Sequence, residues 1–431
     1  MSTPVWLGID LGTSGCRICV IDDENKLVFQ RQQTFSSHVP YPDPPQQWQI
    51  VLTLLRQTSQ SADKENWQIR AIAIAATSGT VMRGRPDGQP DSPMLRYDNA
   101  VAIDQVNEIK AIAPKHSGAH GIGSGLAKYL YLNQHYSSDK PGLLMHQADW
   151  IATQLGGQAG ITDYHNALKS GFDPVALCWP DWLSRWMPAT ALPRVVAPGS
   201  MIGSLSDTVA QHIQLKQDIR PAIVAGTTDS LAAFLATGAN QCGDGVTSLG
   251  STLVVKQLCN QPYFEPESGI YSHKMGRYWL VGGASNSGSA VISQFFTDPQ
   301  IKQLSEHINL AQQPPWYYPL LTMGERFPVA DPDKQPQLTP RPEQDSLFLH
   351  GLLAGIANIE AIAYQRLQQL TATPLQRIRT VGGGAANAIW SKIRQQKLAV
   401  PFIAVAHTEA AYGCALLAKE GLSSFEREQD D

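Results

Sequence analysis

The sequence has no surplus of basic residues. Its 431 residues include 33 Lys and Arg against 37 Asp and Glu, which gives a formal net charge of −4 at pH 7, and no Lys/Arg-rich run is interleaved with aromatic residues. Proteins that bind nucleic acids or anionic membranes usually carry such basic patches. We therefore expect neither nucleic acid nor a membrane as a partner, which leaves small neutral or anionic molecules.

Long apolar segments are also missing. No uncharged apolar stretch approaches the roughly 20 residues of a membrane span. The first ten residues hold no basic residue and reach Asp10 too early for a signal peptide. We expect a cytoplasmic protein that exists as a monomer or homodimer.

Cysteine chemistry has little support in the sequence. The six cysteines are scattered, and only Cys16 and Cys19 form a C-x-x-C pair. These two lie on an apparent strand, where residues three apart face opposite sides of the sheet, and no second ligand pair follows. Buried reduced thiols are therefore expected there in place of a zinc or redox site.

Two short turns, far apart in the chain, are nearly alike. They read Asp10-Leu11-Gly12-Thr13-Ser14 and Ser248-Leu249-Gly250-Ser251-Thr252, each between two β-type apolar runs. A glycine followed by two hydroxyl residues offers backbone N–H and side-chain O–H donors to a small anion, typically a phosphate. Because the sequence contains no P-loop motif, we expect the two turns, one in each half, to grip a polyphosphate from both sides. The carboxylate of Asp10, whose counterpart is Ser248, predicts a Mg²⁺ ligand.

The length and the order of the elements predict an α/β protein of two domains. A chain of 431 residues exceeds what one core usually supports, so we expect domains 1–242 and 243–431. Apolar runs indicate strands over 5–9, 17–21, 26–35, 70–76, 220–225, 244–247, 253–255, 278–281, 379–381 and 402–405. Helical periodicity indicates helices from 47 and over 126–132, 147–155, 231–237, 287–296, 353–370, 388–398 and 409–419, and 312–343 is expected to be an extended loop.

Polar clusters follow two of the expected strands. Thr77-Ser78-Gly79-Thr80 comes after the strand at 70–76, and Gly226-Thr227-Thr228-Asp229-Ser230 comes after the strand at 220–225. Open α/β sheets bind ligands at the carboxyl ends of their strands. Asp229 could be there only because Asp is favoured at a helix N-terminus. It could equally be the base that accepts a hydroxyl proton during phosphoryl transfer, and its position alone leaves both interpretations open.

A glycine triplet, Gly382-Gly383-Gly384, precedes Asn387 and the last but one expected helix. Glycines let the backbone approach a flat ligand such as adenine or its ribose closely. The pattern is one glycine short of a dinucleotide-binding motif, so packing between strand and helix is the other interpretation.

Taken together, these motifs resemble those of the FGGY carbohydrate kinases, a family of the actin/Hsp70/sugar-kinase superfamily. The resemblance covers nearly the whole chain, in family order. It rests on residues 8–14 with Arg17, 43–48, 126–128, 162–164, 166–167, 171–173, 192–193, 199, 202–203, 226–230, 283–288, 324–328 and 382–385. It implies an ATP-dependent sugar kinase of two actin-like (ribonuclease H-like) α/β domains with a cleft between them.

The resemblance also implies roles for individual residues. Asp229 would be the catalytic base, and Asp10 and Asp229 would lie beside Mg²⁺. The contacts with ATP would come from Gly12, Thr13, Ser14 and Arg17 in the first half, and from Gly250, Ser251, Thr252, Gly288, Gly383, Gly384 and Asn387 in the second.

The choice of sugar rests on fewer residues. The segment Thr77–Thr80 lacks both the Arg-Glu pair of glycerol kinases and the Met-His pair of xylulose kinases, and it is similar to that of ribulose kinases. A ketopentose such as D-ribulose is therefore expected, with Ser78, Asp98 and Asp229 contacting the sugar. Xylulose, glycerol or another polyol is the alternative substrate, and a non-kinase actin-like ATP-binding sensor is the alternative class.

Overall fold

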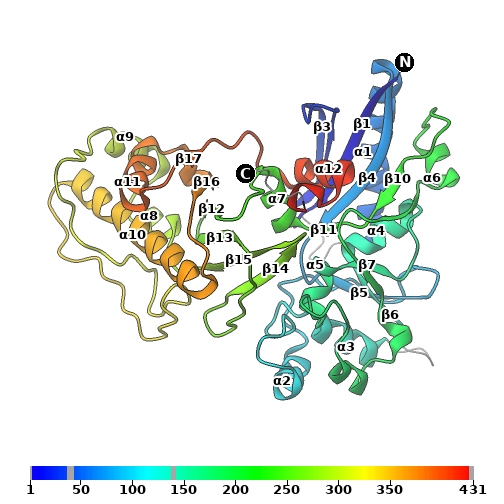
Figure 1. Cartoon of the computed structure of the whole chain (residues 1–431), viewed down its shortest axis with the longest axis horizontal. Coiled ribbons are helices and arrows are strands. Elements are labelled where there is room, and N and C mark those ends of the chain that lie inside the picture. Colours follow the sequence, from blue (N-terminus) through cyan, green and yellow to red (C-terminus); the bar gives the residue numbers. More distant parts are fainter. Residues whose placement is uncertain (1, 36–42, 137–141, 427–431) are drawn as a thin grey trace. The chain divides into compact units, whose positions relative to one another are not determined.

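The computed structural model describes residues 2–35, 43–136 and 142–426. The chain forms two compact units (Figure 1): unit 1 is Met1–Gly238 together with His407–Asp431, and unit 2 is Ala239–Ala406. Both units contain a mixed sheet covered by helices. The predicted α/β architecture is therefore observed in each unit.

The main sheet of unit 1 has the strand order β3-β2-β1-β4-β10-β9, and β11 pairs with β4 beyond the end of β10. β1, β2 and β3 form an antiparallel meander, whereas β4 runs parallel to β1, β10 and β11. The strands are β1 Thr3–Leu11, β2 Gly15–Ile21, β3 Leu27–Thr34, β4 Trp67–Ala76, β9 Met201–Ser204, β10 Ala222–Val224 and β11 Thr227–Thr228.

Alternating residues of β1 and β2 build a core on each face of this sheet. One core joins the strands to α1 (Pro44–Glu65), α4 (Gln147–Leu155) and α6 (Asp207–His212), and it contains Cys16. The other core lies against α7 (Asp229–Ala236) and α12 (Ala410–Glu420), and it contains Cys19. The two cysteines thus face opposite sides as free, buried thiols, as predicted, and burial raises the pKa of both.

Helix α12 belongs to unit 1, although it comes at the end of the chain. Figure 1 shows it, in red, beside β1 and α7. Gly8 and Gly413 permit this contact, because a Cβ at Gly8 would lie 2.0 Å from the carbonyl oxygen of Ala411 and a Cβ at Gly413 would lie 1.8 Å from that of Ala232. The compact units therefore differ from the predicted domains 1–242 and 243–431 in where His407–Asp431 lies.

A second region of unit 1 follows β4 and has its own small core. The sequence indicated its helix at 126–132 but not the helix at Ile103–Ile112, and most of its other elements are short strands and one-turn helices. Its elements are β5 Val81–Gly84, α2 Ile103–Ile112, α3 Gly125–His135, β6 Leu143–His146, β7 Ile161–Asp163, α5 Tyr164–Ala167, η1 Leu168–Ser170, η2 Asp181–Arg185, η3 Ala189–Ala191 and β8 Arg194–Val196.

Unit 2 contains a sheet of order β14-β15-β13-β12-β16-β17. Helices pack against it around one apolar core. Its elements are β12 Asp244–Leu249, β13 Leu253–Cys259, β14 Tyr271–Met275, β15 Tyr278–Ala284, α8 Ser289–Ser293, α9 Asp298–Glu306, α10 Asp345–Thr371, β16 Arg377–Val381, η4 Gly383–Ala386, α11 Ala388–Leu398 and β17 Phe402–Ile403, and η5 Ser423–Phe425 follows α12 in unit 1.

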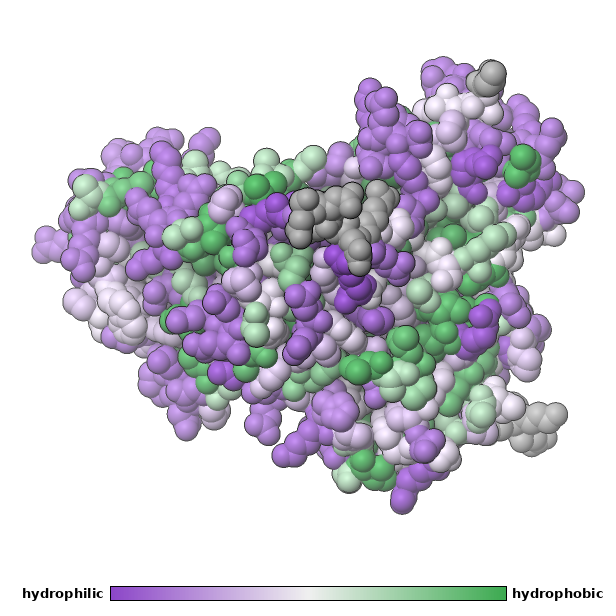
Figure 2. Space-filling view, in the orientation of Figure 1, coloured by the Kyte–Doolittle hydropathy of each residue, from purple (hydrophilic) through white to green (hydrophobic). Residues whose placement is uncertain are grey.

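Helix α10 begins at Asp345, earlier than the expected Leu353, because the buried residues Phe348, Leu349 and Leu352 extend its apolar face toward the N-terminus. Among the described residues, it is also the one helix that is long and apolar enough to span a membrane. However, 72% of that apolar window is buried inside the protein. Figure 2 shows hydrophilic residues over much of the visible surface of both units. α10 is therefore the core helix of unit 2.

Candidate active site

Three parallel strands of unit 1 end side by side. In the register of the sheet, Asp10 of β1 pairs with Ala75 of β4 from one side, and Thr227 of β11 pairs with Ala75 from the other. The first phosphate turn, the Thr77–Thr80 segment and Asp229 all follow these strand ends directly. The structure thus brings three of the predicted polar clusters to one edge of one sheet.

Asp10 is the most deeply buried carboxylate at this edge, with 5% of its surface exposed. Burial, together with the negative charges of Asp229 and Glu409, raises its pKa to about 7 against the opposing effect of Arg17. Its Oδ1 atom is buried and accepts no hydrogen bond from the described part of the chain. An acceptor left without a partner in this way is costly unless a ligand satisfies it.

Asp229 is the first residue of helix α7 and is half-buried. Its Oδ1 atom accepts the backbone N–H of Ser230 at 2.7 Å. The preceding residue, Thr228, has a buried Oγ1 that forms no hydrogen bond within the described residues. Two buried oxygens, from Asp10 and Thr228, are thus available at the strand ends that flank β4.

The first phosphate turn spans Gly12 to Ser14 and is closed by a hydrogen bond from the N–H of Gly12 to the carbonyl of Gly15 at 3.0 Å. Thr13 and Ser14 are exposed, so their hydroxyls face outward. Arg17 lies on β2 opposite Asp10, and its Nη1 is 4.0 Å from Asp10 Oδ2 and 3.5 Å from Glu409 Oε2. Glu409 was not expected at this site, because it comes from the far end of the chain.

The Thr77–Thr80 segment is a tight turn held by its own hydroxyls. Thr77 Oγ1 and Thr80 Oγ1 are 2.6 Å apart, and Thr80 Oγ1 also accepts the N–H of Tyr97 at 3.1 Å. Ser78 lies between them, half-buried, and its hydroxyl forms no hydrogen bond with a described residue. Of the two side chains predicted to bind the sugar with Asp229, Ser78 is available for a ligand.

Asp98, the other side chain predicted to bind the sugar with Asp229, is exposed and already forms an ion pair. Arg96 donates to both of its carboxylate oxygens, from Nε at 3.1 Å and from Nη2 at 2.8 Å. A role for Asp98 in binding sugar would therefore require this ion pair to be shared or broken. Asp98 stays a predicted sugar contact of lower rank than Ser78.

Lys169 is a site residue that the sequence did not reveal. A Cβ placed on Gly79 would lie 3.5 Å from its Cδ, and one placed on Gly123 would lie 3.7 Å from its Nζ. Burial lowers the pKa of Lys169, and the negative charge of Asp229 opposes that shift. The ammonium donates no hydrogen bond to a described residue. A lone lysine inside the otherwise buried motif Asn166–Gly171 was the signal that could have found it.

The neighbours of Lys169 hold its backbone in place. The adjacent Ser170 hydroxyl contacts Nε2 of His146 at 2.9 Å, and Nδ1 of His146 contacts Asp149 Oδ2 at 2.8 Å. Asp163 accepts the N–H groups of His165 and Asn166 at the start of α5. The motif around residues 162–173 is thus a buried polar network that positions one lysine.

In unit 2, the second phosphate turn leaves β12 at Leu249 and joins β13. Ser251 and Thr252 are exposed, like their counterparts in the first turn. Gly288 packs against this turn, because a Cβ there would lie 2.3 Å from the carbonyl oxygen of Ser251. The N–H and the hydroxyl of Ser289 both donate to the carbonyl of Gly250, at 3.0 and 2.6 Å. The structure thus unites Gly250, Ser251, Thr252 and Gly288.

The glycine triplet lies at the end of β16, next to β12. A Cβ on Gly382 or Gly384 would meet Leu249, whereas one on Gly383 would have no atom within 4 Å. The backbone at Gly383 is therefore open to a ligand. The Asn387 side chain accepts the N–H of Trp390 at 3.0 Å as the cap of α11 and donates to Ser305 Oγ at 2.9 Å, so Asn387 also has a structural role.

A buried glutamate from the long loop supports the second turn. Glu325 accepts hydrogen bonds from the hydroxyl of Ser285 at 2.7 Å, the N–H of Asn286 at 2.8 Å and the hydroxyl of Tyr318 at 3.1 Å. Ser285 and Asn286 come just before Gly288 in the chain. The motif Gly324–Pro328, which the sequence placed only in a loop, therefore fixes the backbone beside the second phosphate turn.

The two hydroxyl-rich turns, each at the end of a central strand in its own α/β unit, define the class of a two-domain phosphate-binding protein. The N-terminal domain of the FGGY family of carbohydrate kinases matches residues 5–236, and the C-terminal domain of that family matches residues 222–419. The chain belongs to the FGGY family of carbohydrate kinases. This confirms the resemblance and the predicted enzyme class, an ATP-dependent carbohydrate kinase.

Individual relatives are distant in sequence but match most or all of the chain. The apulose kinase of Pectobacterium atrosepticum is 24% identical, over 100% of this chain and 92% of that kinase. The xylulose kinase of Escherichia coli K12 is 22% identical, over 90% of this chain and 84% of that kinase.

Solved structures share the fold. A xyloylose kinase from Brucella ovis superposes with a TM-score of 0.85 at 20% identity, covering 97% of this chain and 90% of that chain. The glycerol kinase of Plasmodium falciparum, solved with ADP, gives 0.83 at 16% identity, covering 99% and 92%. The predicted α/β fold of two actin-like domains is thereby confirmed.

Proposed function

We propose that this kinase transfers the γ-phosphoryl group of ATP to a hydroxyl of a ketopentose, with D-ribulose as the first candidate. The observation that carries the proposal is the placement of Asp229. It begins α7 at the same sheet edge as Asp10 and the Thr77–Thr80 turn, so a sugar that contacts Ser78 can also reach the Asp229 carboxylate.

Asp229 would accept the proton of the attacking hydroxyl, and Ser78 would hold a neighbouring sugar oxygen. A carboxylate suits this role because phosphoryl transfer requires little more from the protein than a positioned base and stabilisation of charge. Lys169 would donate to a further oxygen of the sugar, because its ammonium lies among glycines and is electrostatically coupled to Asp229.

The residues at the strand ends fit a Mg²⁺ ion that enters with ATP. Asp10 offers a buried oxygen without a partner among the described residues, and Asp229 lies beside it. No group of three His, Cys, Asp or Glu side chains in the described chain could hold a metal alone, and Mg²⁺ usually binds one or two carboxylates together with phosphates and waters. When bound, the ion would neutralise charge on the phosphoryl oxygens.

Each phosphate turn would donate to ATP from its own unit. In unit 1 the donors are Thr13, Ser14 and the backbone from Gly12, with Arg17 beside them. In unit 2 they are Ser251, Thr252 and the backbone around Gly250 and Gly288, while the open backbone at Gly383, next to Gly384, would accept the adenosine.

The preference for a ketopentose rests on what the sugar-binding turn contains. The side chains of Thr77, Ser78 and Thr80 are hydroxyls and Gly79 has none, so the segment contains no acidic or basic group. Kinases named for xylulose and apulose occur among the relatives, and this supports the class of substrate. Ribulose is proposed from the turn itself.

The test is a comparison of kcat/KM for D-ribulose, L-ribulose, D-xylulose and glycerol in an assay coupled to ADP release. D-ribulose is expected to give the highest value, and Asp229→Asn and Asp229→Ala should lower kcat by roughly 10²–10⁴-fold. If no sugar accelerated ADP release, the proposed sugar kinase activity would be contradicted and a role as an ATP-binding sensor would be supported. A higher kcat/KM for xylulose or glycerol than for D-ribulose would contradict the proposed substrate and identify the preferred one.

A further inference from the structure

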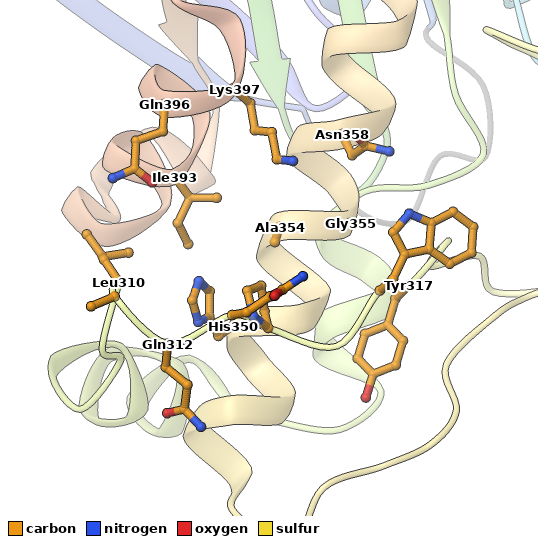
Figure 3. A pocket seen from close by; sticks show the side chains of 14 residues that line it. Leu310, Gln312, Tyr317, His350, Ala354, Gly355, Asn358, Ile393, Gln396 and Lys397 are labelled. Atoms are coloured by element: carbon orange, nitrogen blue, oxygen red, sulfur yellow. The ribbon is translucent and has the colours of Figure 1, made fainter.

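Unit 2 contains a cavity of about 460 Å³ between α10, α11 and the segment that follows α9. Figure 3 shows it from close by. His350, Ala354 and Asn358 line it from one side of α10, and Ile393, Gln396 and Lys397 line it from the C-terminal half of α11. Both sets recur at the spacing of one helix face, and this size is typical of small-molecule sites.

One residue that lines the cavity is a histidine whose ring has no hydrogen-bond partner in the described part of the protein. His350 is 4% exposed, and its ring makes no hydrogen bond with any residue in the described ranges. Figure 3 shows the imidazole turned toward the cavity, below Ala354. Buried polar groups in proteins are nearly always satisfied by protein, water or ligand. The His350 ring is therefore able to bond to water or to a ligand in the cavity.

The residues that line the cavity carry positive charge only. Lys397 is the single charged residue among the fourteen that line the cavity, and no Asp or Glu is among them. In Figure 3 its side chain extends from α11 toward α10, on the same side as Asn358. A lone ammonium without a carboxylate beside it favours an anionic group on the ligand.

The uncharged lining suits a hydroxylated ring. Four carboxamides contribute both donors and acceptors, as hydroxyl groups require, and the indole of Trp316 is 58% exposed, so one aromatic face is open. Ala354, Gly355 and Ile393 add a small apolar floor. The carboxamides come from Gln312, Gln313, Asn358 and Gln396.

This cavity is separate from the predicted nucleotide contacts. None of Gly288, Gly383, Gly384 and Asn387 lines it. Asn387 caps the N-terminus of α11, whereas Gln396 and Lys397 lie in its last turn. Two sites therefore lie toward opposite ends of one helix.

We propose that this cavity is a second binding site, specific for a sugar monophosphate, with the phosphate at Lys397 and the sugar hydroxyls at His350 and the carboxamides. The site is independent of the reaction proposed above. Because phosphorylated sugars are the product class of a carbohydrate kinase, such a site would let the concentration of product act on the nucleotide-binding unit through α11.

The experiment reads the cavity directly. The full chain, labelled with ¹⁵N at its ten tryptophan indoles, is titrated with D-ribose 5-phosphate, and the Trp316 resonance is assigned with Trp316→Phe. We expect this resonance to shift in a saturable way. Lys397→Gln should weaken the apparent affinity at least tenfold, because it removes a charge-assisted hydrogen bond. Ala354→Leu, which fills the cavity, should abolish the shift.

Lys392→Gln is the matched control, because Lys392 is an exposed lysine of α11 that does not line the cavity. It should leave the affinity unchanged, and the other nine indole resonances report that each variant is folded. D-ribose and inorganic phosphate should each bind at least tenfold more weakly. The proposal is overturned if the Trp316 resonance does not move, if Lys397→Gln binds as wild type does, or if phosphate alone binds as well as the sugar phosphate.

Discussion

Burial and, after it, the negative charge of Asp229 raise the pKa of Asp10, because Asp10 near the end of β1 and Asp229 directly after β11 lie on the two sides of β4 at one sheet edge. Two close carboxylates cannot both be ionised without cost unless a cation or a proton lies between them. With its pKa raised to about 7, Asp10 binds a proton at pH values below about 7. Mg²⁺ would replace it in the proposed reaction.

The first prediction concerns the stability of the protein without ligand. A carboxyl pKa raised from 3.8 to about 7 means that the folded chain binds the proton more tightly than the unfolded chain does. This contribution is fully present below pH about 4 and is lost as the pH rises to about 7, by on the order of 4 kcal/mol in total. Asp10→Asn removes it.

Thermal unfolding in EDTA between pH 4 and pH 8 measures this difference. Asp10→Asn should be clearly more stable than wild type at pH 8, and the two curves should converge toward pH 4. The variant should also lose kinase activity, so stability and function would change in opposite directions. A difference that is the same at every pH would show that Asp10 does not titrate in this range.

The sequence predicted which functional groups lie at the sheet edges better than it predicted which residues surround them. Asp10 and Asp229 were found because each follows an apolar strand within a cluster of hydroxyl residues. Lys169 and Glu409 were not found, because they reach the site only through long-range packing. Glu409 in particular depends on α12 returning to β1, which Gly8 and Gly413 permit and which no local pattern encodes.

Lys169 carries the second prediction. Lys169→Met should lower kcat/KM for the sugar by roughly 10–100-fold, the effect of losing one hydrogen bond from a charged donor, while the KM for ATP stays within about twofold of wild type. Steady-state kinetics with each substrate varied in turn separates the two. Lys64→Met, at a side chain that is 83% exposed, is the control. A wild-type KM and kcat in Lys169→Met would remove this residue from the sugar site.

The third prediction tests the packing of the C-terminal helix on unit 1. In Gly413→Ala the new Cβ would lie 1.8 Å from the carbonyl oxygen of Ala232, so α12 must move away from α7. We expect a loss of about 1–3 kcal/mol in the free energy of unfolding, measured in urea. Gly12→Ala is the matched change, because the nearest atom to its Cβ is 3.9 Å away, and its stability should be unchanged. Equal stability of both variants would mean that α12 is not tightly packed.

The last prediction concerns the ion pair inside unit 2. Glu360 of α10 and Arg394 of α11 are both fully buried and form two hydrogen bonds, at 2.6 and 2.7 Å. Thr247 of β12 and Thr380 of β16 complete the network, so it joins the two helices to the strands that lead into the second phosphate turn and the glycine triplet.

Removing one partner leaves an unpaired buried charge, so Arg394→Met and Glu360→Leu should each destabilise unit 2 by about 3–5 kcal/mol. The double variant should lose much less than the sum, because a well-packed apolar pair is often nearly neutral there. Urea unfolding of all four proteins completes this cycle. If the two single losses simply added, Glu360 and Arg394 would have no interaction energy with each other, and the ion pair would not be what couples α10 to α11.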